Sequence, residues 1–120
     1  MRIVNKDIFL VQPAGTLFSK YSETRGGIGE LMIKSDTWAH GDFLYQDIRD
    51  AIENMGSEDW QDKLDDSQHN GTELAMDFDC LGRDGCFEDD QLYAIWSDED
   101  RLALIKRLEM CGPLTKSKDN

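Results

Sequence analysis

Apolar and polar residues alternate along five stretches of the chain, and this period of two is typical of half-buried β-strands. The clearest stretches are Ala75–Cys80 and Gln91–Trp96. Between them lies the pair Asp84-Gly85, a strong hairpin signal because glycine readily adopts the positive φ that such a turn needs. We therefore expect these two strands to pair as a hairpin that organises the fold. The other expected strands are Thr16–Tyr21, Glu30–Ser35 and Phe43–Ile48.

A capped helix is expected directly after the second strand of this hairpin. Ser97 and Asp100 have the spacing of a capping box, in which the serine hydroxyl accepts a hydrogen bond from the backbone N–H three residues on. Gly112 and Pro113 mark the end of the helix. Its hydrophobic residues recur at three- and four-residue spacing, namely Leu102, Leu104, Ile105, Leu108 and Cys111. The pattern predicts an apolar face, and we expect that face to cover the hairpin.

Two further helices are indicated. Asn5 is a good N-cap for a short helix over Lys6–Val11, and its inward side chains are predicted to be Ile8, Phe9 and Val11. A second helix is predicted from Ser57 through Asp66, with Trp60 and Leu64 as a narrow apolar stripe. The stretch between them is ambiguous. Residues 43–55 suit either a strand that passes into a short helix over Asp50–Met55 or a single helix, and we favour the first.

These elements predict a single α+β domain over residues 1–113, with a polar, frayed tail at 114–120. We expect a mostly antiparallel sheet of about five strands packed against two or three helices. No run of about 18 apolar residues occurs, so no membrane span is expected. The start of the chain turns polar after Val4, which is unlike a signal peptide. Three cysteines, an odd number, fit reduced thiols, and together these features predict a cytoplasmic protein.

Charge is the strongest compositional feature. The net charge is −12, and the acids are concentrated in two segments: residues 42–66 carry nine acids and two bases, and residues 73–100 carry ten acids and one base. This sign argues against direct binding of DNA or RNA. It permits a basic protein partner, although an acidic surface also serves solubility alone. We expect the two acidic segments to converge on one face.

Candidate chemistry is weak by comparison. Counting from Asp77, an EF-hand pattern matches at Gly82 and Glu88 but fails at Leu81, where an oxygen ligand is required. The cysteines and histidines lack the paired spacing of a zinc site, and nothing surrounds them that indicates a catalytic nucleophile. We therefore expect no enzymatic activity, no cofactor and no bound metal.

The expected function is that of an acidic interaction module. Charge and an aromatic anchor for a basic partner are predicted at Asp77, Asp79, Asp84, Glu88, Asp89, Asp90 and Tyr93. The alternative is a domain that binds a small ligand or calcium, in which Trp38, His40 and Tyr45 line a cleft beside the hairpin acids. The oligomeric state is left open.

Four segments together resemble a group of small acidic proteins encoded by phages and prophages. They are PAGTLFSKY (Pro13–Tyr21), GELMIKSDTW (Gly29–Trp38), DFLYQDI (Asp42–Ile48) and MDFDCLGRDGCFEDDQLYAIW (Met76–Trp96). The group has no established activity, so the resemblance implies no catalytic residue. It implies a context, which is the cytosol of a bacterial host and an accessory protein or inhibitor that acts on a host target.

Overall fold

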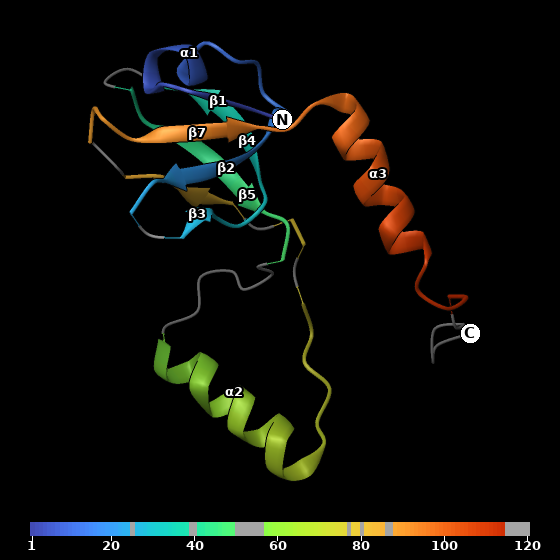
Figure 1. Ribbon diagram of the computed structural model, residues 1–120. Helices are drawn as coiled ribbons and strands as arrows, with labels where there is room; N and C mark the ends of the chain where they lie inside the picture. The colour runs from blue at the N-terminus through green and yellow to red at the C-terminus, as the bar shows by residue number, and fades with distance from the viewer. Residues whose placement is uncertain are drawn as a thin grey trace.

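The structure is a computed structural model that describes residues 1–24, 26–38, 41–49, 57–76, 78–79, 81–85 and 88–114. Figure 1 shows a twisted sheet with one short helix across it and two longer helices that project away from it. In chain order the elements are β1 (Arg2–Val4), α1 (Lys6–Leu10), β2 (Leu17–Ser22), β3 (Gly27–Ile28), β4 (Met32–Thr37), β5 (Phe43–Asp47), α2 (Ser57–Asn70), β6 (Gly82–Arg83), β7 (Leu92–Ile95) and α3 (Asp98–Glu109).

The sheet is antiparallel at every pairing among the described strands. Its order is β1-β7-β2-β4-β5-β6, and β3 pairs with β2. The α+β fold class is therefore confirmed, with seven strands among the described residues instead of about five. Strands β2 and β5 lie where the alternation predicts them, and β4 begins two residues later than predicted. Strands β1 and β3 are too short to give a periodic signal.

The predicted hairpin is wrong. β7 has β1 on one edge and β2 on the other, so both of its edges are occupied. In Ala75–Cys80, the four described residues form no strand, and residues 77 and 80 lie outside the described part. The chain instead returns to the sheet through β6, which pairs with β5, and the Asp84 N–H donates to the Phe43 carbonyl at 3.0 Å.

Helix α1 covers one face of the sheet, and Phe9 is its only apolar side chain that is fully buried. Asn5 caps it as predicted, because its side-chain oxygen accepts a hydrogen bond from the Ile8 N–H at 2.9 Å. Phe9 is fully buried, whereas Ile8 and Val11 are exposed, against the prediction. The buried residues of this five-residue helix are Lys6 and Phe9, and Leu10 packs against the core beside them.

The core on this face is built from aromatic rings. Phe9 stacks on Tyr93 with 4.0 Å between the ring centroids, and it lies 4.6 Å from Phe18 and 5.2 Å from Phe43. All four rings are fully buried. They come from α1, β2, β5 and β7, so the cluster joins segments that are up to 84 residues apart. Such ring contacts stabilise the fold beyond the burial of apolar area alone.

A lysine is buried beside this cluster. The Lys34 ammonium donates to the Ser35 carbonyl at 3.0 Å and lies 5.9 Å from the centroid of the Phe9 ring. Burial lowers the pKa of Lys34 below 10.5, and the nearby Asp36 carboxylate opposes that shift in part. The cause is desolvation, since a charged ammonium loses more favourable solvation free energy than a neutral amine when water is removed.

Stability is therefore expected to rise with alkaline pH through this one residue. Between the lowered pKa of Lys34 and 10.5, the unfolded chain holds a proton that the folded chain has released, so raising the pH favours folding. Below that window the cost of burying the charge is constant. Thermal melts at several alkaline pH values test this expectation. As the pH rises through the window, the melting temperature of the wild type should increase relative to that of Lys34→Met. Parallel pH profiles for the two proteins would contradict this expectation.

The two long helices differ from the prediction in how they pack. The Ser97 capping box is confirmed, with Asp100 N–H donating to Ser97 Oγ and Ser97 N–H to Asp100 Oδ2, both at 3.1 Å. Yet along α3, every residue of which is described, no side chain is buried, so this helix does not cover a hairpin. Helix α2 is four residues longer than predicted and stands apart from the sheet. The residues 50–56 that precede it, including the expected helix at Asp50–Met55, lie outside the described part.

Candidate functional site

An acidic pocket opens where the end of β2 lies beside the start of β7. The register pairs Tyr21 with Leu92, which brings the turn after β2 next to the loop that leads into β7. The cavity has a volume of about 420 Å³. Its lining residues are Tyr21, Ser22, Glu23, Thr24, Glu88, Asp90, Gln91 and Leu92.

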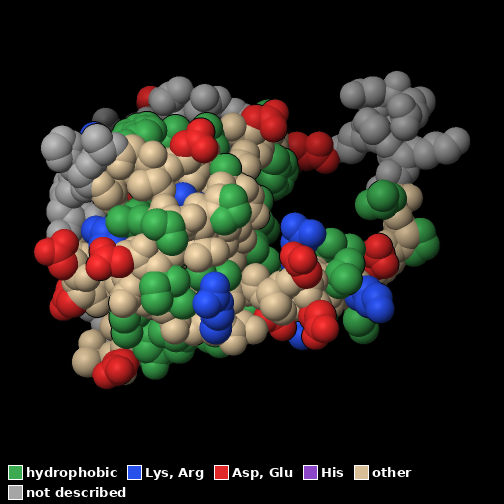
Figure 2. All heavy atoms as spheres, turned by 90° about the horizontal axis from the view of Figure 1, so that it is seen from above, with side chains coloured by type: hydrophobic (Ala, Val, Ile, Leu, Met, Phe, Trp, Pro, Cys, Tyr) green, Lys and Arg blue, Asp and Glu red, His purple; other side chains and the backbone are tan. Residues whose placement is uncertain are grey.

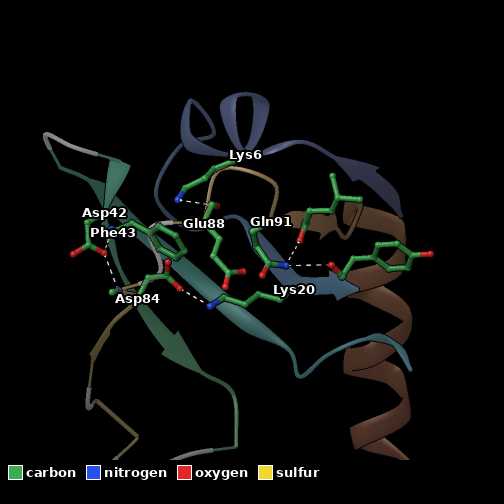
Figure 3. A network of polar contacts seen from close by, with 10 residues as sticks. Lys6, Lys20, Asp42, Phe43, Asp84, Glu88 and Gln91 are labelled. Carbon is green, nitrogen blue, oxygen red and sulfur yellow. Dashed lines mark hydrogen bonds and ion pairs between the residues drawn. The ribbon is translucent and has the colours of Figure 1, made fainter. Parts of the chain in front are cut away.

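Hydrogen bonds from side chains to backbone carbonyls hold the loop that forms one wall of this pocket. The Gln91 side-chain amide donates to the carbonyl of Tyr21 at 3.1 Å and to that of Leu92 at 2.8 Å. The Lys6 ammonium, from α1, lies 3.4 Å from the Glu88 carbonyl oxygen, to which it donates. Figure 3 shows Gln91 and Glu88 held in this way between the sheet and α1. These contacts come from three separate elements, so they limit the positions that the loop can adopt.

The pocket is suited to a cationic group. The described residues that line it include the carboxylates of Glu23, Glu88 and Asp90 and no basic side chain. All three are exposed, so they remain hydrated and available. A guanidinium or ammonium group can pair with several carboxylates at once, and a rigid arrangement lowers the entropy that such binding costs.

Two of the residues predicted to bind a partner are buried instead. Tyr93 is fully buried and stacked on Phe9, so it belongs to the core and cannot anchor a partner. The Asp84 side chain is 1% exposed and its Oδ1 lies 2.7 Å from the Lys20 ammonium, so its charge is balanced within the fold. Figure 3 shows this ion pair between β2 and the segment that follows β6.

The remaining predicted residues are divided among several places. Glu88, Asp89 and Asp90 are exposed together in the loop before β7, and the pocket includes the first and third of them. Asp79 is also exposed, but it lies near a different strand from those that border the pocket. The carbonyl of the preceding residue, Phe78, accepts a hydrogen bond from the side chain of Gln46 in β5. Asp77 lies outside the described residues.

The alternative ligand site does not come together around the described residues. His40 lies outside the described part of the chain. Tyr45 is partly buried and packs against the core, while Trp38 is exposed at the end of β4 with the Arg83 guanidinium 5.8 Å from its ring centroid. Neither aromatic side chain lines the acidic pocket.

Arg83 has a structural partner of its own. Its Nε donates to Oδ2 of Asp42, a side chain that is almost fully buried, and the N–H groups of Phe43 and Gly85 donate to Asp42 Oδ1 at 2.9 and 3.1 Å. The hydrogen bond from Arg83, together with these two backbone donors, holds the pKa of Asp42 below its ordinary value. The Asp42 carboxylate therefore links Arg83 of β6 and Gly85 to the start of β5, so its role is structural.

The acids of the described residues do not gather on one face. They form separate groups in α2, in the loop before β7 and in the first turn of α3, while Asp42 and Asp84 are paired inside the fold. Figure 2 shows acidic side chains spread around the visible surface, with basic side chains among them. The single acidic face that the sequence predicts is therefore wrong for these residues, which form several separate acidic groups. Of these groups, the one in the loop before β7 lies beside a pocket.

Metal and membrane chemistry find no support in the part of the chain that the structure describes. Within it, no group of three or more His, Cys, Asp or Glu side chains is placed to hold a metal ion. None of the described helices combines the length and the hydrophobicity that crossing a bilayer requires.

Comparisons with protein families, with characterised proteins and with solved structures find no match for this chain. The assignment of a functional site therefore rests on the residues of this chain alone. Among these, Glu23 is absent from the sequence prediction. Its position in the pocket follows from the pairing of β2 with β7, two strands that are 70 residues apart, and no local pattern signals that pairing.

Proposed function

We propose that this protein is a non-enzymatic interaction module that binds a basic protein through the acidic pocket. The observation that supports it is the convergence of Glu23, Glu88 and Asp90 around one cavity beside a loop that Gln91 and Lys6 hold in place. An arginine or lysine of the partner enters the pocket, and the surrounding negative charge raises the rate of encounter.

The proposal includes a biological context, which comes from the resemblance to phage and prophage proteins. In that context the basic partner is a protein of the bacterial host, and binding blocks or redirects it. A host protein that itself binds nucleic acid has the required charge, since such proteins carry basic surfaces.

Neutralising the pocket is expected to abolish most of the binding to a cationic probe. The probe is an arginine-rich peptide, titrated by calorimetry at low salt and again at about 0.15 M salt, where charges beyond about 8 Å are screened. The triple variant Glu23→Gln, Glu88→Gln and Asp90→Asn should bind at least about tenfold more weakly, which corresponds to about 1.4 kcal/mol. Wild-type binding should itself weaken as salt increases.

A matched control separates the pocket from overall charge. Asp59→Asn, Asp62→Asn and Asp65→Asn remove the same number of charges from exposed positions in α2. This control should keep nearly all of the affinity. An equal loss in both triple variants would mean that diffuse charge attracts the peptide, and the pocket would then have no special role.

A further inference from the structure

The C-terminal end of α2 carries a dipeptide with reactive side-chain chemistry, Asn70-Gly71. In such a pair the backbone nitrogen of glycine can attack the side-chain amide carbon of asparagine, because glycine has no Cβ to hinder the approach. The new C–N bond closes a succinimide ring, and the asparagine nitrogen leaves as ammonia with the proton that the glycine nitrogen gave up. Water then opens the ring at either carbonyl, which gives aspartate or isoaspartate.

This end of α2 is accessible and weakly held. Asn70 and Gly71 are both exposed, and Gly71 has a φ of 71°. Over residues 59–70, where the side chains of α2 are described, none is buried, and the helix stands apart from the sheet (Figure 1). A helix of 14 residues without buried contacts is marginal in water, so its last turn opens readily.

Two hydrogen bonds engage the reactive groups while the last turn is closed. The Gly71 N–H donates to the Ser67 carbonyl at 2.9 Å, so the attacking nitrogen is part of the helical ladder. The Asn70 Nδ2 donates to Oδ1 of Asp66 at 2.7 Å, which fixes the amide against the preceding turn. Ring closure therefore requires the last turn to open, and its rate follows the population of the open form.

The fold protects a second dipeptide that can form the same ring, Asp84-Gly85. The Asp84 side chain is 1% exposed, and its Oδ1 lies 2.7 Å from the Lys20 ammonium. The Gly85 N–H donates to the Asp42 carboxylate at 3.1 Å. Opening this turn would separate a buried ion pair, which costs far more than opening the end of an exposed helix. Of these two dipeptides, the structure therefore leaves the one in α2 reactive.

We propose that Asn70 is a site of spontaneous covalent modification, and that its conversion to aspartate or isoaspartate loosens the end of α2. In either product a carboxylate replaces the amide that donates to Asp66. The hydrogen bonds from Asn70 and Thr72 hold the pKa of Asp66 below its ordinary value, so Asp66 is ionised at neutral pH. The modification thus exchanges a hydrogen bond for two like charges at the negative end of the helix dipole. No described residue of α2 lines the acidic pocket, so this inference is independent of the function proposed above.

Peptide mapping by mass spectrometry, after the full chain has stood for several weeks at neutral pH, tests the site. Asn70 should gain the mass that replaces NH₂ with OH, while Asn5, which precedes a lysine, should stay unchanged. Asp66→Ala removes the acceptor of the Asn70 amide and should speed the conversion at least about twofold. Asp62→Ala is the matched control, because it brings the same gain in helix propensity at another exposed position of α2, and it should not speed the conversion.

Circular dichroism of two further variants measures the effect on α2. Asn70→Asp has the carboxylate of one product, whereas Asn70→Gln keeps a neutral amide that reacts far more slowly, because it would close a larger ring. At neutral pH and low salt, Asn70→Asp should contain less helix than Asn70→Gln, and the difference should shrink as salt increases. Equal helix content in the two variants overturns the loosening of α2. An Asn70 that stays intact, or that converts no faster than Asn5, overturns the site itself, and equal rates in the wild type and Asp66→Ala overturn the protective role of the closed turn.

Discussion

Replacing Phe9 with alanine is expected to cost about 3–5 kcal/mol of folding free energy, the range for removing a buried aromatic ring. Phe9 is fully buried at the centre of the core and contacts Phe18, Phe43 and Tyr93. Since the free energy of unfolding of small domains is only about 5–15 kcal/mol, this substitution should remove a large part of the protein's stability. The melting temperature should fall by roughly 10–20 °C.

Chemical denaturation of Phe9→Ala measures this cost directly, and the neighbouring residue supplies the control. Ile8 is on the same short helix but is exposed. Ile8→Ala should therefore change stability by only about 0.5 kcal/mol, as surface substitutions commonly do. Equal effects at the two positions would show that α1 is not held to the sheet by the Phe9 ring.

Local signals in the sequence predict the elements better than their partners. The caps at Asn5 and Ser97 form as expected because a side-chain oxygen and a backbone N–H three residues on are all that such a cap requires. Gly85 also has the positive φ that the sequence predicts, 62°. The error lies in the predicted pairing of strands, because alternation indicates that a segment is a strand and does not indicate which strand lies beside it.

The candidate site shows the same limit. Alternation places Tyr93 on the opposite face of β7 from Leu92 and Ala94. Because both faces of this strand are apolar, the pattern cannot identify the face that α1 covers. Glu23 and Glu88 meet only because β2 pairs with β7. The burial and pairing of Asp84 also depend on tertiary structure, since its partner Lys20 lies 64 residues earlier in the chain.

The Lys20–Asp84 ion pair gives the second large effect, and its two partners are expected to respond unequally. The Asp84 side chain is 1% exposed, whereas Lys20 is 36% exposed. Lys20→Met leaves a carboxylate buried without the ammonium that lies 2.7 Å away, so it should cost about 3 kcal/mol, the low end of the range for breaking a buried pair. Asp84→Asn should cost less, about 1 kcal/mol, because the remaining ammonium can turn toward water.

The double variant decides whether the buried charge is the cause. If the cost of Lys20→Met comes from the unbalanced carboxylate, adding Asp84→Asn removes that charge and should restore about 2 kcal/mol, so the double variant resembles Asp84→Asn alone. Urea denaturation of the four proteins at neutral pH closes this cycle. Additive costs would mean that Lys20 stabilises the sheet by the packing of its aliphatic chain, and the charge of Asp84 would then be balanced by other groups.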